Sequence, residues 1–256
     1  MYFSSLPKVH LFGIQNEANG EQLNYVLDEN ELLNKGPNGT LSPVFDAIKK
    51  FNKGEKHLKL TCDNAVGQNK NNATIKFCQF LVMAGYYESV ELHFMIAGHT
   101  KFSPDRNYGM IKKLFYKSTI FSKEEFVKIV EESSFLNKVQ CYEDGKGFEY
   151  YDFKVLGEYF IKLPKIGKYH HFFFEKPNPK VVKIKDFVDS EWEEFDLLKT
   201  DGREREEVIE EIRKLAFTIL PPKSLSLERQ KYLYKEVRPL LPEEYQDIVC
   251  PMPSVV

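Results

Sequence analysis

The chain has 256 residues, 42% of them hydrophobic and 14% aromatic, which is enough to bury one substantial core and a smaller second one. Its net charge of −2 provides no overall positive field for nucleic acid, so any such binding would need local clusters of basic residues. Four cysteines without CxxC spacing (Cys62, Cys78, Cys141 and Cys250) argue against a zinc site or a disulfide framework and for a reducing compartment. We expect Cys62 and Cys78 in the core. The sequence has no apolar run of about 18 residues and no signal-peptide pattern, so we expect neither membrane insertion nor secretion.

Apolar runs and turn signals predict regular elements up to about residue 118. Two β-rich runs, Val9–Glu17 and Gln22–Asp28, flank an Ala-Asn-Gly turn signal and predict an antiparallel hairpin. The next element is a helix, with Ser42 as its N-cap and Pro43 at its first position. The pattern then predicts a strand at His57–Cys62, a helix at Asn72–Ala84, a strand at Val90–Ala97 and a helix at Pro104–Phe115.

The order β-β-α-β-α-β-α is that of an RNase H-like nuclease or transposase domain without its first strand. In that fold the first strand lies in the middle of the sheet, and its carboxylate helps to hold a divalent metal. We therefore predict an α/β protein. Its core, over residues 1–118, is an RNase H-like mixed sheet with flanking helices that lacks the central first strand.

For residues 119–256 the sequence predicts a smaller C-terminal part of the α+β class. A capping box, Ser122 with Glu125, opens a helix. Three strand-like runs between Lys168 and Leu198 predict a small antiparallel sheet, and two charge-rich helices follow between Gly202 and Leu240, which we expect to pack on it. The adjacent His170 and His171 are interpreted as strand residues and not as ligands, because neighbouring strand residues point to opposite faces.

Two polar segments, Asp63–Lys70 and Gly98–Asp105, each follow a predicted strand. In α/β sheets, sites form at the carboxyl ends of strands. Two carboxylates brought together there repel each other unless one is protonated or a cation such as Mg²⁺ lies between them. In two-metal phosphoryl transfer Asp63 would bridge the ions and Asp105 would be the third acid. His99 would be a ligand or would orient the attacking water.

Polar and basic residues beside these acids are candidates for contacts with a nucleic-acid backbone. Such contacts come from cationic and amide side chains and do not require a positive net charge. The candidates are Gln68, Asn69, Lys70, Lys101, Arg106, Lys112 and Lys113.

Several of these candidates also have a purely structural interpretation. An Asp-Asn pair after a strand is common in Asx turns and helix caps, which would explain Asp63. Asp105 lies in the first turn of a predicted helix, a favourable position for a negative charge. His99 would be a hydrogen-bonded structural histidine, and Lys112 and Lys113 would lie on a solvated helix face.

Several segments together closely resemble a domain of unknown function found in transposon-derived proteins of animals and fungi. The segments are LTCDNAVGQNKNN, LHFMIAGHTKFSPDRNYGMIKK, YHHF and LPPKSLSLERQKYLYKEVRPLLPEE, and the resemblance spans nearly the whole chain. Members look like RNase H-fold transposase cores of the DDE type, which implies cut-and-join chemistry on DNA with Mg²⁺ or Mn²⁺. By motif position Asp63 matches the second acid, whereas His99 and Asp105 match the final GHT-x-F-x-PD element.

The relatives place an Asp-bearing strand upstream of the segment that corresponds to residues 2–13, and we expect this chain to begin after it. Asp28 is an alternative acid. The resemblance implies a DDE transposase-like protein with impaired or absent catalysis, a DNA partner, and a nuclear rather than a cytoplasmic location. Without the first strand, the backbone N–H and C=O groups of its neighbouring strands would have no hydrogen-bond partners. We therefore expect a homo-oligomer or a partner protein that supplies a strand. The alternative is a domesticated, non-catalytic module that binds nucleic acid or protein. No phosphate-binding glycine loop or nucleophile motif supports a small-molecule enzyme.

Overall fold

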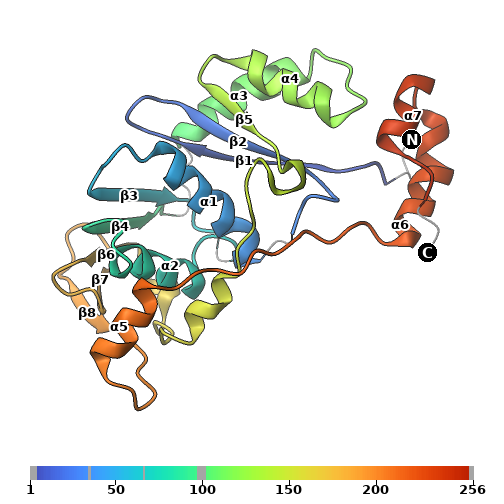
Figure 1. Cartoon of the computed structure of the whole chain (residues 1–256). Coiled ribbons are helices and arrows are strands. Elements are labelled where there is room, and N and C mark those ends of the chain that lie inside the picture. The colour runs from blue at the N-terminus through green and yellow to red at the C-terminus, as the bar shows by residue number, and fades with distance from the viewer. Residues whose placement is uncertain (1–4, 34–35, 66, 97–101, 254–256) are drawn as a thin grey trace. The chain divides into compact units, whose positions relative to one another are not determined.

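The computed structural model describes residues 5–33, 36–65, 67–96 and 102–253 (Figure 1). The chain is of the α/β class and divides into two compact units, each built from separate stretches of sequence. Unit 1 comprises Met1–Leu33, Lys101–Glu149 and Pro221–Val256, and unit 2 comprises Asn34–Thr100 and Tyr150–Leu220. Whether a functional domain ends at residue 118 stays a prediction.

Unit 1 contains the predicted hairpin. Strands β1 (Val9–Gln15) and β2 (Gln22–Asp28) pair antiparallel, and β5 (Asn137–Gln140), which the sequence analysis missed, pairs parallel with β2. Helices α3 (Ser103–Phe115) and α4 (Lys123–Ser133) pack on this sheet through a small core around Val26, Ile111 and Val130. The capping box predicted for α4 is confirmed, since Ser122 accepts from the backbone N–H of Glu125 and the Glu125 carboxylate accepts from that of Ser122.

The C-terminal part of unit 1 is helical and irregular. Helix α6 (Leu227–Tyr232) runs into a π-turn (Leu233–Val237) and a 3₁₀-turn (Arg238–Leu240), and α7 (Glu243–Val249) follows. Arg229 of α6 is bound to Glu29, with Nη2 2.7 Å and Nε 3.1 Å from its carboxylate oxygens. This bidentate pair ties α6 to the end of the hairpin.

Unit 2 is built on a five-stranded sheet of order β3-β4-β6-β7-β8. The two predicted strands form as β3 (His57–Cys62) and β4 (Ser89–Phe94), which pair parallel. The three predicted strands of the second half form, as β6 (His171–Glu175), β7 (Val181–Lys185) and β8 (Glu193–Asp196). The expected separate small sheet is wrong, because β6 pairs antiparallel with β4 and the strands extend one sheet.

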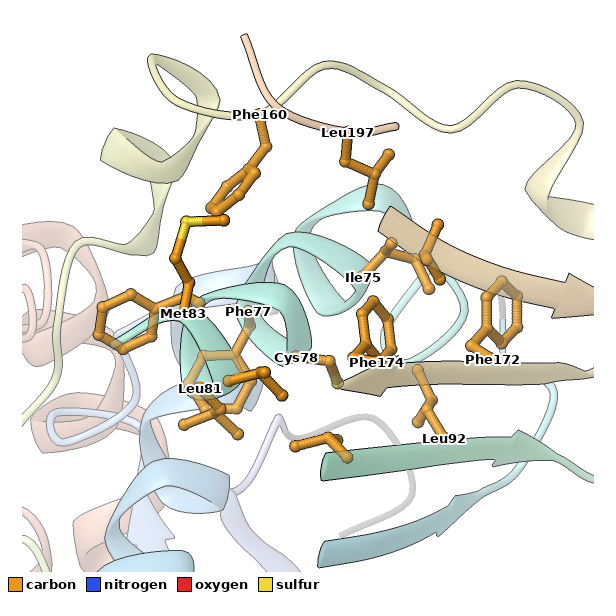
Figure 2. Packing of buried hydrophobic residues seen from close by; sticks show 14 of the residues in the cluster. Ile75, Phe77, Cys78, Leu81, Met83, Leu92, Phe160, Phe172, Phe174 and Leu197 are labelled. Atoms are coloured by element: carbon orange, nitrogen blue, oxygen red, sulfur yellow. The ribbon is translucent and has the colours of Figure 1, made fainter. Parts of the chain in front are cut away.

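One face of this sheet carries the main core. Alternate residues of β4 and β6, among them Leu92, Phe172 and Phe174, are fully buried and pack on α2 (Asn72–Met83), as Figure 2 shows. The opposite face carries the polar residues of the same strands, as the two-residue period of a strand requires. Cys78 is buried in the core and Cys62 packs against it, as expected.

Helices α1 (Pro37–Phe51) and α5 (Arg205–Arg213) complete unit 2 and add residues to the same core. The predicted start of α1 is wrong. Gly36 is the N-cap and Pro37 lies in the first turn, so Ser42 and Pro43 are inside the helix. Pro43 has no N–H to bond there, and the Ser42 hydroxyl donates to the carbonyl oxygen of Asn38 at 2.7 Å.

Short 3₁₀-turns at Glu143–Gly145, Phe153–Gly157 and Ile166–Lys168 connect the remaining elements. In the part of the chain that the structure describes, no helix has both the length and the apolar character needed to cross a membrane.

Candidate functional site

Asp63 follows the last residue of β3, at the sheet edge where the parallel strands β3 and β4 both end. Its side chain is exposed, and its Oδ1 accepts hydrogen bonds from Asn69 Nδ2 at 2.5 Å and from the backbone N–H of Ala65 at 3.3 Å. The bond to the backbone two residues on is an Asx turn. The local geometry is therefore that of the structural interpretation, with a carboxylate that still reaches solvent.

Lys70 ends the same loop, but its side chain is only 1% exposed. Nζ lies 5.6 Å from the centroid of the Phe94 ring and has no hydrogen-bond partner among the described residues. Burial lowers the pKa of Lys70, and the negative charge of Asp186 acts in the opposite direction. Such an amine is not part of an exposed phosphate-binding surface, whereas the neighbouring Gln68 is exposed.

Asp105 lies in the first turn of α3, where its Oδ2 accepts from the backbone N–H of Phe102 at 3.3 Å. This contact caps the helix, and the position also suits a negative charge. Asp105 belongs to unit 1 and Asp63 to unit 2, so neither unit by itself contains both acids. His99 and Lys101, two of the other predicted site residues, lie outside the described residues.

The described residues do not form a cage for Mg²⁺ or Mn²⁺ around Asp63. No group of three or more His, Cys, Asp or Glu side chains within the described ranges is arranged to hold one ion. The alternative acid Asp28 is also used in a turn, because its Oδ1 accepts from the backbone N–H groups of Asn30 and Glu31 at 2.7 and 3.1 Å. Both Asp63 and Asp28 therefore use a carboxylate oxygen within a turn, and the metal-binding role of Asp63 and Asp105 stays a prediction.

Helix α3 presents the exposed basic residues. Arg106, Lys112 and Lys113 are all solvent-exposed, and Lys117, which the sequence analysis did not single out, is exposed in the turn that follows. Arg106, Lys113 and Lys117 have i, i+7, i+11 spacing, which places them on one stripe. That spacing was the signal that would have identified Lys117.

The charges of Arg106, Lys112, Lys113 and Lys117 are not neutralised by ion pairs within the described part of unit 1. None of the four side chains makes an ion pair with a described residue, whereas Lys123, Arg229 and Arg238 of the same unit pair with Glu31, Glu29 and Asp247. An aromatic ring accompanies them, because Lys112 Nζ lies 5.6 Å from the centroid of Tyr116, a side chain that is 72% exposed. We refer to Arg106, Lys112, Lys113, Tyr116 and Lys117 as the α3 basic face.

Comparison with known protein families gives one match. The model of a family described as Domain of unknown function (DUF7869) matches residues 4–190, which is more than half of the chain. The chain therefore belongs to this family. Neither the search of curated proteins nor the search of solved structures finds a match.

Proposed function

We propose that this DUF7869 protein is a transposase-like, transposon-derived protein that binds DNA through the α3 basic face and does not cleave it. The carrying observation is the set of four exposed cations on α3 and its following turn, none paired with a described acid. The RNase H-like ancestry and the nuclear location are part of this proposal and rest on the motif resemblance.

Local positive charge favours DNA as the partner. Binding to a duplex is driven largely by release of counterions from phosphates that lysine and arginine neutralise, and it needs a basic patch but no positive net charge. Four cations on α3 and the turn after it, none in an ion pair with a described residue, meet that need. The exposed ring of Tyr116 adds a surface on which an unpaired base would stack.

The hydrogen bonds of Asp63 favour a chain that does not cleave DNA. Its carboxylate is committed to the loop by Asn69 and Ala65, and the described residues add no second and third ligand to it. A chain that binds DNA without hydrolysing it corresponds to the domesticated module considered above. A protein-binding module is the competing interpretation.

The test of DNA binding is fluorescence anisotropy with a labelled duplex over a range of salt concentrations. The slope of log K against log salt is negative, and we expect its magnitude to decrease by roughly 3 to 4 when Arg106, Lys112, Lys113 and Lys117 are replaced by Gln, because four phosphate contacts are lost. A control with the same charge change carries Gln at Lys53, Lys146, Lys162 and Lys214. Equal loss in both variants, or no binding by the natural chain, would overturn the proposal.

The test of catalysis is nicking of supercoiled plasmid with Mg²⁺ or Mn²⁺. We expect no metal-dependent nicking by the natural chain. Nicking that disappears in Asp63→Asn, with an unchanged melting temperature, would identify an active nuclease. That result would overturn the non-catalytic part of the proposal and leave DNA binding in place.

Open sheet edges are the basis for a protein partner. Among the described residues β3 pairs only with β4, and β1 only with β2, so each presents an unpaired ladder edge. We propose that a strand from a second copy of the chain pairs with one of these edges. Light scattering should then show a dimer or a larger oligomer, and a monomer with one cooperative unfolding transition would contradict this part.

A further inference from the structure

Two histidines face each other on the polar side of the sheet in unit 2. His93 of β4 and His171 of β6 are direct partners in the antiparallel register, and their Nδ1 atoms lie 2.7 Å apart. The ring centroids are 5.0 Å apart, with 65° between the ring planes. The neighbours Leu92 and Phe172 point into the core, so both imidazoles lie on the opposite face.

A carboxylate determines which nitrogen of His93 carries the proton. Glu91 Oε2 lies 2.9 Å from His93 Nε2, and an ionised carboxylate only accepts hydrogen bonds. Nε2 of a neutral His93 therefore carries the proton, and Nδ1 has a free lone pair. In the 2.7 Å contact the donor must then be Nδ1–H of His171.

Moving the His171 proton from Nδ1 to Nε2 changes what this pair can do. The ring stays neutral, and each Nδ1 then has a lone pair on the side that faces the other ring. Because a metal ion lies about 2.0–2.1 Å from each imidazole nitrogen, a rotation of the two rings brings both lone pairs onto an ion beside the present contact. From this geometry we propose that His93 Nδ1 and His171 Nδ1 bind a divalent transition-metal cation, of the class of Ni²⁺, Cu²⁺ or Zn²⁺, with water as the remaining ligands.

The chemistry of the donors selects this class of ion. Imidazole nitrogen suits zinc, copper and nickel, whereas Mg²⁺ requires oxygen ligands, so the site is distinct from the metal centre of a nuclease. Glu91 would act as the carboxylate that orients a ligating histidine and raises its basicity. The His93 side chain is 20% exposed, which leaves room for an ion to enter from solvent.

Some charged side chains around the histidine pair repel a bound cation, and one attracts it. Within the sheet, Lys185 is the register partner of His171, and Lys59 is the partner of Glu91. Both lysines repel a cation, while the Glu91 carboxylate attracts it. Thr61, the partner of His93 on β3, is uncharged. Two imidazoles and water therefore predict a weaker site than a structural zinc centre, which has four protein ligands.

The experiment is isothermal titration of Ni²⁺ into the full chain, with Mg²⁺ as the control ion. We expect one Ni²⁺ per chain and no Mg²⁺ at this place, with binding abolished in His93→Gln and in His171→Gln. His57→Gln is the matched control, because His57 is an exposed histidine on the same sheet. The His57→Gln variant should bind Ni²⁺ with the affinity of the natural chain. Glu91→Gln should weaken binding by about tenfold without abolishing it.

A second readout uses the natural chain alone and does not depend on whether a variant folds. Zinc added to ¹⁵N-labelled protein should shift the Nδ1 resonances of His93 and His171 and leave those of His57 unchanged. The inference is overturned if Ni²⁺ does not bind, if either single variant binds as well as the natural chain, or if zinc leaves both Nδ1 resonances in place. The site lies in unit 2 and the α3 basic face in unit 1, so failure of either proposal is independent of the other.

Discussion

Asn69 Nδ2 donates a hydrogen bond to Asp63 Oδ1 at 2.5 Å, which closes the loop between β3 and α2. A side chain that resembles a catalytic acid by motif is thus also a structural element of its own loop. Replacing Asp63 by Ala should lower the free energy of unfolding by about 1 kcal/mol, because two hydrogen bonds are lost at an exposed position. Urea unfolding measures this, and Asn69→Ala should give a similar loss. Unchanged stability in both variants would contradict the bond.

The start of helix α2 depends on Asn71. Its Oδ1 accepts from the backbone N–H groups of Ala73 and Thr74 at 2.9 and 3.1 Å. Asn71→Ala should therefore cost about 1 kcal/mol of unfolding free energy, measured by urea denaturation. Asn71→Asp keeps an acceptor and should retain the stability of the natural chain. Equal losses in the two variants would show that the cap is not the cause.

The buried amine of Lys70 should make stability depend on alkaline pH. Its pKa is lowered in the folded chain, whereas an unfolded lysine has a pKa near 10.4. Between these two pKa values the unfolded chain binds more protons than the folded chain, so the free energy of unfolding rises with pH. Below the folded-state pKa the burial of charged Lys70 lowers the free energy of unfolding by its full amount.

Lys70→Met should remove this contribution. We expect the unfolding free energy at pH 7 to rise by roughly 1–3 kcal/mol, because an unpaired buried donor is removed. The alkaline rise in stability should also disappear. Urea denaturation between neutral and alkaline pH tests both effects, with the exposed Lys53→Met as control. If Lys70→Met destabilises the chain at pH 7, the amine has a favourable partner.

Burial should keep two thiols unreactive in the folded chain. It raises the pKa of Cys62 to about 12, with the negative charge of Asp63 adding to the effect, and it also raises that of Cys78. Alkylation requires the thiolate, so iodoacetamide at pH 8 should label both residues slowly until urea unfolds the chain. Asp63→Asn should speed labelling of Cys62 and leave Cys78 unaffected. Peptide mapping by mass spectrometry measures the rates, and rapid labelling of native Cys78 would contradict its burial.

Local signals in the sequence determined most of the secondary structure. The order of elements from β1 to α3 and the capping box at Ser122 and Glu125 follow from hydrophobic periods, turn residues and caps, which act over a few positions. The error at Ser42 arose from the same kind of signal. Two prolines, Pro37 and Pro43, each mark a possible first turn, and local chemistry does not choose between them.

Pairing between distant segments was decided only by the tertiary structure. The β6 strand could complete a small sheet of its own or extend the sheet of β4, and its alternating pattern suits both. The burial of Lys70 and the contact of His93 with His171 depend on which strands become neighbours. The sequence by itself determined the family motifs and the type of each long element. The partners of those elements, and hence the environment of each candidate side chain, depend on long-range packing, which leaves no periodic trace in the sequence.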